Sequence, residues 1–380
     1  MAVGGSFKCR SQKKSQEDLE MESKLAYVAA TRSTSQLIKS QMEIKFPNNC
    51  DIYSIFSFCN EITDCDFNED IFIDFSSMGR VEPFTMVYLA KVIRDIKSNS
   101  PNSKIFCEGF QDKKYAANMG FFRAFGLKHG REPSINNGNE SFVPFSLLRT
   151  KTVADEALRS WSPQQDIIEN KSAQLAKILS REIDGNLVDA LTFSIREIMR
   201  NVIEHSQSKT IEYCAQYWPT YDKVEISISD NGIGLRKSLE DNPYIQVDND
   251  SDALQQALMP AISSKNYKGA IIDRNDPWHN SGFGLYMINR ICRTGGSFLI
   301  CSGDHGIFLN AEEKKHIYLN HKYQGTIVRM VLNTKKIKKL PEMLREYRDE
   351  GYEIAKSIKG VGYYQASAAS QMLSRDFKNK

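Results

Sequence analysis

The sequence lacks three features that would place it in a specialised class of protein. None of its eight cysteines forms a C-x-x-C pair, which argues against a zinc site and against a disulfide framework. No stretch reaches the ~18 consecutive apolar residues of a spanning helix, and the N-terminus has no apolar signal segment. We therefore expect neither secretion nor a membrane, and a reducing cytoplasmic setting is the simplest interpretation.

An excess of charge is also missing. The 50 basic and 47 acidic residues leave a formal net charge of +3, so composition gives no electrostatic argument for nucleic acid as a partner. Hydrophobic residues make up 41% and charged residues 26% of the chain, the balance of a folded protein. Because 380 residues are enough for two cores, we expect two domains.

The first half of the chain alternates strand and helix patterns after a polar N-terminal segment, residues 1–41. The apolar run "DIFIDFSS" (70–77) predicts a buried strand, and "SKIFCEGF" (103–110) predicts a second. A helix pattern begins near Pro83, and another covers 113–127. This alternation predicts an α/β domain over residues 42–128, with a parallel sheet backed by helices.

The second half has a different order of elements. Residues 129–159 mix Gly, Pro, Asn and Ser with a few apolar residues, which indicates a linker. Helices are then expected early and strands late over 160–335, which predicts an α/β sandwich with helices on one face of a mixed sheet. A helical tail, 336–380, follows. The expected elements are helices at 162–183 and 284–294 and strands at 209–217 (edge-like), 223–229, 297–302 and 325–333.

One helix in this half carries a polar ridge. In "SIREIMRNVIEHS" (194–206), Glu197, Asn201 and His205 recur every four residues and therefore project from one side. A solvated face is the ordinary explanation for such a ridge on an amphipathic helix. The alternative is a functional face, and other motifs favour it.

Two glycine-containing motifs follow the ridge. The strand "KVEISIS" ends in "DNGIG" (230–234), where Asp230 offers a carboxylate beside Gly232 and Gly234. Asp-Asn-Gly is a hairpin signal when taken alone, but the second glycine favours close approach of a flat ligand. Gly282-x-Gly284 then opens a helix whose N-terminus is suited to bind phosphate.

Taken in order, these motifs resemble the GHKL ATP-binding fold of gyrase, Hsp90, MutL, histidine kinases and the anti-sigma-factor kinases. The resemblance covers about residues 160–335 and includes "QGTIVRMVL" (324–332) as the final strand. It implies ATP and Mg²⁺ as ligands. By that resemblance Asn201 would coordinate Mg²⁺, Glu197 would act as general base, and Asp230 would accept from the adenine amino group.

The resemblance also assigns the remaining site residues. Gly232 and Gly234 would line the base pocket, and Thr326 would lie behind the adenine. The stretch 236–281 would be the ATP lid, with Gly282, Gly284 and Leu285 at its phosphate-facing end. His205 would end the helix motif as a packed residue or as a ligand contact. Lys265 in the lid would reach the γ-phosphate, unless it is an ordinary solvated lysine.

Residues 42–127 resemble STAS-like domains by pattern. In anti-anti-sigma members of that family a phosphorylatable Ser opens the helix after the strand, whereas Pro83 stands at about that position here, with Ser76, Ser77 and Thr85 nearby. The resemblance therefore implies a docking domain rather than a phosphorylation switch.

Three functions follow from these resemblances. The first is an ATPase that acts as a regulatory switch on a protein partner, bound through the STAS-like domain or the tail. The second is a serine/threonine kinase of the anti-sigma-factor type, and the third is a non-catalytic ATP-binding scaffold. An autophosphorylating histidine kinase is disfavoured because the helix at 162–183 contains no His. Nucleic acid is disfavoured but not excluded, and a homodimer stays open.

Overall fold

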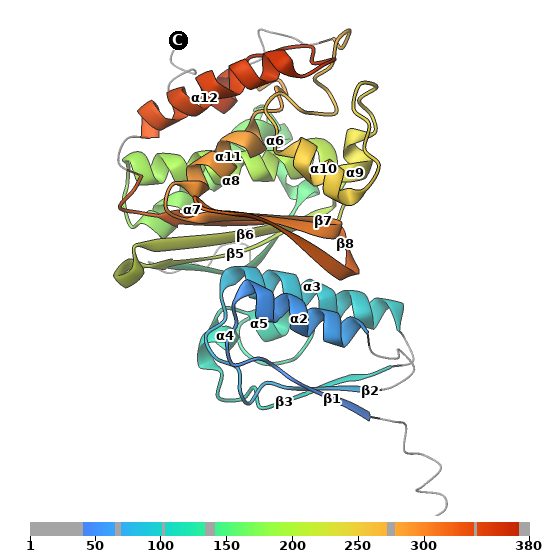
Figure 1. The fold of residues 1–380 in the computed structure, drawn as a ribbon. Helices are drawn as coiled ribbons and strands as arrows, with labels where there is room; N and C mark the ends of the chain where they lie inside the picture. Colours follow the sequence, from blue (N-terminus) through green and yellow to red (C-terminus); the bar gives the residue numbers. More distant parts are fainter. Residues whose placement is uncertain are drawn as a thin grey trace, which may run out of the picture.

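The computed structural model describes residues 41–64, 70–100, 103–133, 141–271, 278–337 and 340–371. Its layers alternate: a small sheet, a pair of helices, a larger sheet and a second set of helices (Figure 1). The first two layers come from residues 41–124, and the last two come from residues 142 onward (Figure 1). Residues 1–40 of the polar N-terminal segment, for which the sequence pattern predicts a helix near 16–31, lie outside the described residues.

The N-terminal domain contains the predicted parallel sheet. The strands β1 (Gln41–Lys45), β2 (Asp70–Asp74) and β3 (Ile105–Glu108) pair in that order, each parallel to its neighbour. Pro83 occupies the start of α3 (Pro83–Asn99), as predicted. The helix predicted at 113–127 is divided into α4 (Lys114–Asn118) and α5 (Phe121–Ala124), because Gly120 lies between them at φ 79°.

The C-terminal domain is built on a five-stranded sheet of order β4-β5-β6-β8-β7. All its neighbouring strands pair antiparallel, so the sheet is antiparallel and not the predicted mixed sheet. The strands are β4 (Phe142–Arg149), β5 (Thr210–Trp218), β6 (Lys223–Asp230), β7 (Ser297–Leu309) and β8 (Lys314–Asn333).

The prediction of a linker over 129–159 is wrong for its second half. Residues 142–149 form β4, which pairs with β5, and α6 (Thr150–Ser160) follows directly. Consequently β4 is the edge of the sheet and β5, predicted to be edge-like, is an inner strand. Pro144 is tolerated in β4 because it lies at an edge, where the pairing shifts between Val143 and Ser146.

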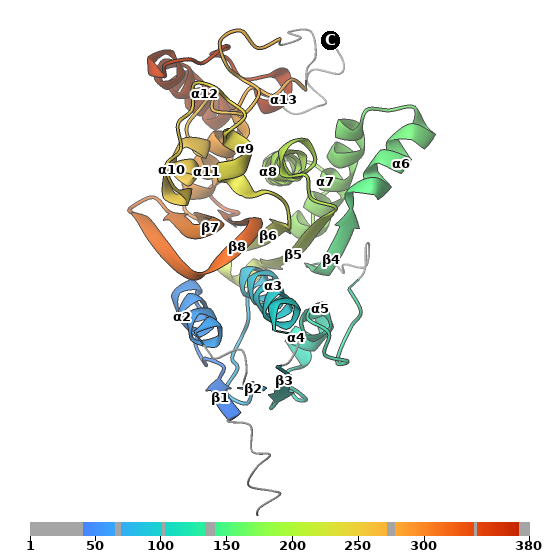
Figure 2. The same cartoon turned by 90° about the vertical axis from the view of Figure 1, so that its right-hand side faces the viewer.

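Helices cover the upper face of the larger sheet, as predicted (Figures 1 and 2). The long α12 lies across them and buries Leu340, Leu344 and Ala355. None of the helices in the described ranges combines the length and the apolar character that a membrane crossing needs. The remaining helices are α2 (Ile52–Thr63), α7 (Gln164–Ser180), α8 (Asn186–Asn201), α9 (Gly234–Leu239), α10 (Asp250–Ala257), α11 (Gly284–Arg293), α12 (Leu340–Ser357) and α13 (Ala368–Gln371).

The lower face of the larger sheet is covered by α2 and α3 of the N-terminal domain (Figure 2). Their side chains share one apolar cluster with residues of the sheet, and Tyr88 of α3 stacks on Tyr323 of β8, with 5.3 Å between the ring centres. At the start of α3, Glu82 and the buried Glu225 both accept from Arg329, at 3.0 and 2.8 Å. The two domains are therefore joined by a continuous core and a buried ion cluster.

Candidate functional site

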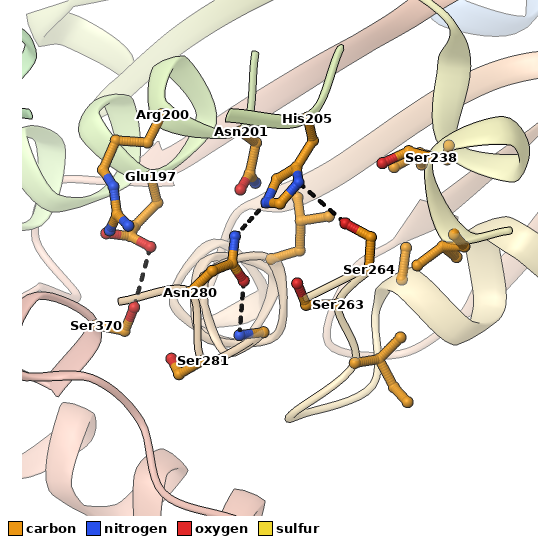
Figure 3. Close-up of a pocket in the computed structure, with 17 residues that line it drawn as sticks. Glu197, Arg200, Asn201, His205, Ser238, Ser263, Ser264, Asn280, Ser281 and Ser370 are labelled. Carbon is orange, nitrogen blue, oxygen red and sulfur yellow. Dashed lines mark hydrogen bonds and ion pairs between the residues drawn. The ribbon is translucent and has the colours of Figure 1, made fainter. Parts of the chain in front are cut away.

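The predicted polar ridge lies at the C-terminal end of α8. The apolar side of this helix packs into the core above the sheet, and its hydrophobic residues are buried. Beyond Asn201 the helix continues as a π-helical turn, Val202–Ser206, which Gln207 ends at φ 57°. Glu197, Asn201 and His205 all line one cavity, so the ridge does not face open solvent (Figure 3).

A second part of this cavity begins where β6 ends. It is lined by Asp230, Gly234 and Thr326, the last from β8. Both parts are lined by Asn201, His205, Leu235, Ser238 and Leu285, so the two hollows adjoin each other across these side chains. The polar ridge of α8, the end of β6 and the glycines after the predicted lid therefore lie around adjoining hollows. Some of these residues are more than a hundred positions apart in the sequence.

Asp230 is a buried carboxylate held by backbone groups. Its Oδ1 accepts from the backbone N–H of Gly232 at 2.7 Å, and the backbone of Thr326 also donates to it. Burial outweighs these bonds and raises the pKa of Asp230 from its ordinary 3.8 to about 6. Its carboxyl can therefore change its protonation state close to neutral pH.

The two glycines after Asp230 have different functions. A side chain on Gly232 would collide with the backbone carbonyl of Ser206, to which Ile233 N donates at 2.8 Å. Gly232 therefore serves close packing against the end of the α8 ridge, whereas Gly234, at φ 76°, lines the cavity itself.

The opposite wall of the cavity is the N-terminus of α11. Gly282 and Gly284 line it, and no side chain in the described part of the chain caps the helix. Gly282 has φ 72°, and a Cβ on it would lie 2.6 Å from the carbonyl oxygen of Ile262 in the lid. Because uncapped backbone N–H groups and the helix dipole attract anions, this wall is suited to phosphate.

His205 joins an interior position and the C-terminal end of the predicted lid to the ridge. Its ring hydrogen-bonds Ser264 Oγ through Nδ1, at 3.2 Å, and the Asn280 amide through Nε2 (Figure 3). Burial, with Lys265 and Arg200 nearby, lowers the pKa of His205 to about 3. A neutral ring that accepts from Asn280 and donates to Ser264 fits both contacts.

Lys265 is exposed, in contrast to its lid neighbours Ser264 and Asn266. Its backbone N–H donates to Ser263 Oγ at 3.2 Å. Its neighbour Ser264 lines the cavity, whereas Lys265 itself does not. Contact of its ammonium with a phosphate stays a prediction.

Glu197 lies at the far end of the cavity from Asp230 and is surrounded by donors. Its Oε1 accepts from Arg196 Nε at 3.1 Å and Arg200 Nη1 at 3.2 Å, and its Oε2 accepts from Ser370 Oγ at 3.1 Å. Burial alone would raise the pKa of Glu197, but the two guanidinium groups outweigh it and hold the pKa below its usual value.

The sequence pattern did not reveal these donors to Glu197. Arg196 is fully buried and also pairs with Glu169 of α7, at 3.0 Å. Arg200 donates to the Trp278 carbonyl at 2.8 Å, and both guanidinium groups lie over the Trp278 ring, within 5.6 Å of its centre. The only sequence signal for these donors is that Arg196 and Arg200 are four residues apart and close to Glu197. On an amphipathic helix such a pair ordinarily indicates a solvent-exposed face.

Comparison with known families agrees with this geometry. The sequence model of the histidine kinase-, DNA gyrase B- and HSP90-like ATPase family matches residues 186–336. The match starts with the first residue of α8 and ends just beyond β8, so it contains the predicted site residues. It supports a GHKL-type ATP-binding domain, either ATPase or kinase. A search of curated proteins finds no match to the chain.

Proposed function

We propose that the chain binds Mg·ATP in the cavity between α8 and α11 and uses its cleavage as a regulatory switch on a protein partner. One observation carries this proposal: side chains from three elements of the GHKL-type domain line two adjoining pockets beside the N-terminus of α11, with Glu197 in one, Asp230 and Thr326 in the other, and Asn201 in both. The adenine lies at Asp230 and Thr326, and the phosphates extend towards Gly282 and Gly284.

The residues present are suited to a magnesium ion held mainly by phosphate and water. Asn201 lines both parts of the cavity, and within the described residues its side chain makes no hydrogen bond (Figure 3). A single neutral oxygen matches Mg²⁺, which keeps several waters and takes few protein ligands at phosphate sites. When bound, the ion would neutralise charge on the phosphates, and Asn201 would hold it at the ridge.

Glu197 supplies the base. The arginines keep its carboxylate ionised at neutral pH, so it can accept a proton. The hydrogen bond from Ser370 demonstrates that a hydroxyl group fits at Oε2. An attacking water at that position would lose its proton to Glu197 while its oxygen faces the terminal phosphate.

A route to the N-terminal domain begins beside the adenine end. Lys91 of α3 donates to Asn231 Oδ1 at 2.8 Å, and Asn231 directly follows Asp230. A movement of the predicted lid would be transmitted to the polar ridge of α8 through the hydrogen bonds of Ser264 and Asn280 to His205. The STAS-like N-terminal domain would thus pass the nucleotide state to the partner that docks on it.

Phosphotransfer to a protein hydroxyl is the second candidate, as in the anti-sigma-factor kinases. It is favoured by the fact that the oxygen at Glu197 in this structure belongs to a serine. The base would have the same role, with a hydroxyl in place of water.

The test measures ATP affinity by calorimetry and phosphate release for the wild-type chain and Glu197→Gln. Glutamine keeps the shape and one acceptor oxygen, so we expect unchanged ATP affinity and a rate lower by about 10²-fold or more. If both proteins bind ATP and neither releases phosphate, the ATPase is refuted, and the remaining candidates are the kinase and a non-catalytic ATP-binding scaffold. Absence of ATP binding to the wild-type chain would refute the proposal.

A further inference from the structure

The C-terminal segment is fastened across the lid of the nucleotide cavity. After α12 the chain turns back, and Gly360 O accepts from Lys268 N at 2.8 Å. Asn266 then bonds Tyr363 in both directions: its Oδ1 accepts from Tyr363 N and its Nδ2 donates to Tyr363 O, each at 2.9 Å. These lid contacts bring the short helix α13 to the end of the cavity that contains Glu197 (Figure 3).

Ser370 on α13 is buried and fixed in position. Its hydroxyl donates to Glu197 Oε2 at 3.1 Å and accepts from Ser367 Oγ at 3.2 Å. The preceding carbonyl, of Ala369, accepts from Arg196. The Ser370 side chain lines the same cavity as Asn201 and Gly284. A hydroxyl with its proton directed at a carboxylate is arranged as a nucleophile beside a base.

We infer that Ser370 is a phosphoacceptor of this chain's own ATP site. The inference rests on the proposed binding of ATP. Ser370 Oγ attacks the γ-phosphorus, an Oγ–P bond forms, and the bond from that phosphorus to the β-phosphate oxygen breaks. The hydroxyl proton passes to Glu197 Oε2, and ADP leaves. The products are phosphoserine 370 and ADP, with no further reactant required.

Other serines in the cavity lack this arrangement. Ser264 bonds His205, and Ser263 Oγ accepts from the Lys265 N–H. Ser281 Oγ has no hydrogen-bond partner within the described residues. Among the cavity serines in the described ranges, Ser370 alone donates to a carboxylate.

The experiment incubates the full-length chain with Mg·ATP and maps phosphate by peptide mass spectrometry. Trypsin releases residues 360–375, GVGYYQASAASQMLSR, in which fragment ions separate Ser370 from Ser367 and Ser374. We expect one phosphoryl group on Ser370, at a rate constant independent of protein concentration because acceptor and site share one chain.

Four variants sharpen the result. Ser370→Ala removes the acceptor, and Ser370→Thr restores a hydroxyl and should restore labelling of the same peptide. Glu197→Gln should slow labelling by about 10²-fold or more. Ser357→Ala is the matched control, because Ser357 is an exposed serine of the same C-terminal segment and its loss should leave labelling unchanged.

Calorimetric ATP binding to the same preparation separates the two levels of failure. If ATP binds and residue 370 stays unmodified, or if Ser370→Ala is labelled as strongly as wild type, the acceptor assignment is wrong and the proposed ATP site stands. If ATP does not bind, the proposed function itself fails, and the acceptor assignment fails with it.

Discussion

Two buried carboxylates in adjoining pockets of the candidate site have pKa values shifted in opposite directions. Asp230 is bound by backbone N–H groups, and burial raises its pKa to about 6. Glu197 is as deeply buried, yet Arg196 and Arg200 keep its pKa below the usual value. Burial is common to both, so the neighbouring charges decide the difference.

The difference separates two chemical tasks. A carboxyl group whose pKa lies close to neutral pH can gain or lose a proton to match the hydrogen-bonding groups on the edge of a flat base. A carboxylate held ionised by two guanidinium groups always has lone pairs free for a proton from a hydroxyl. Under the proposed function, the same side-chain chemistry would serve recognition at Asp230 and proton removal at Glu197, and substitutions beside each carboxylate should have distinct consequences.

Gly325→Ala should have the largest effect, and at the Asp230 end. Gly325 has φ 82°, and a Cβ on it would collide with the Asp230 backbone carbonyl and lie 2.8 Å from its Oδ1. We expect a loss of about 3 kcal/mol in unfolding free energy, measured in urea, because strain and collision add. ATP binding by calorimetry should disappear. Wild-type stability with normal affinity would contradict the tight packing of β8 on this carboxylate.

Gly284→Ala is the matched change at the Glu197 end. Its Cβ would lie 2.6 Å from Glu197 Oε2, the end of a side chain that can move, so the fold should tolerate it. We expect ATP affinity to be kept, while phosphate release or transfer falls by about 10²-fold, since a catalytic group displaced by an ångström costs that order. Equal losses of binding and rate would show that the two ends are not separable.

Asp230→Asn should change how stability depends on pH. The folded chain holds the Asp230 proton more tightly than the unfolded chain, so this stabilisation is complete below about pH 3.8 and is lost as pH rises through about 6. Between pH 5 and pH 8 the wild type should lose about 1.4 kcal/mol that the variant does not lose. Urea titrations of both proteins isolate this term, because other groups such as His205 are shared. Parallel curves would refute it.

Lys91→Met should have the smallest effect, through the interdomain contact beside Asp230. Lys91 is buried, pairs with Asp95 at 2.9 Å, and donates to Asn231. Methionine keeps the apolar length of the side chain but removes the hydrogen bond, so ATP affinity should weaken by about 2- to 5-fold. Calorimetry measures the change, and Lys237→Met, an exposed lysine of α9, is the control. Identical affinities would remove the proposed route between the domains.

Much of the site could be predicted because it depends on local spacing. Glu197, Asn201 and His205 lie one helical turn apart, and the glycines open α11 as expected. Ser370 could not be found in this way, because it is 173 residues from Glu197 and reaches it through tertiary packing. Arg196 was missed for another reason: arginine ordinarily faces solvent, and Glu169 and Glu197 together compensate its burial.

The fold was predictable to a similar degree. The parallel sheet and α3 follow from apolar runs and a helix-starting proline. The sequence predicts a linker where β4 lies, because the proline of this strand and its Gly- and Asn-rich surroundings are typical of loops. An edge position removes the penalty for that proline, and edge positions depend on topology rather than on local sequence.

The shared core of the two domains has a consequence for substitutions in this chain. Cys214, Leu299 and Cys301 of the larger sheet belong to the same apolar cluster as Phe84 and Tyr88 of α3. A different N-terminal domain joined to this sheet would have to supply a matching apolar surface. Otherwise the lower face of the sheet would be exposed to water. Substitutions on one side of this boundary therefore need compensating substitutions on the other side to keep the shared core packed.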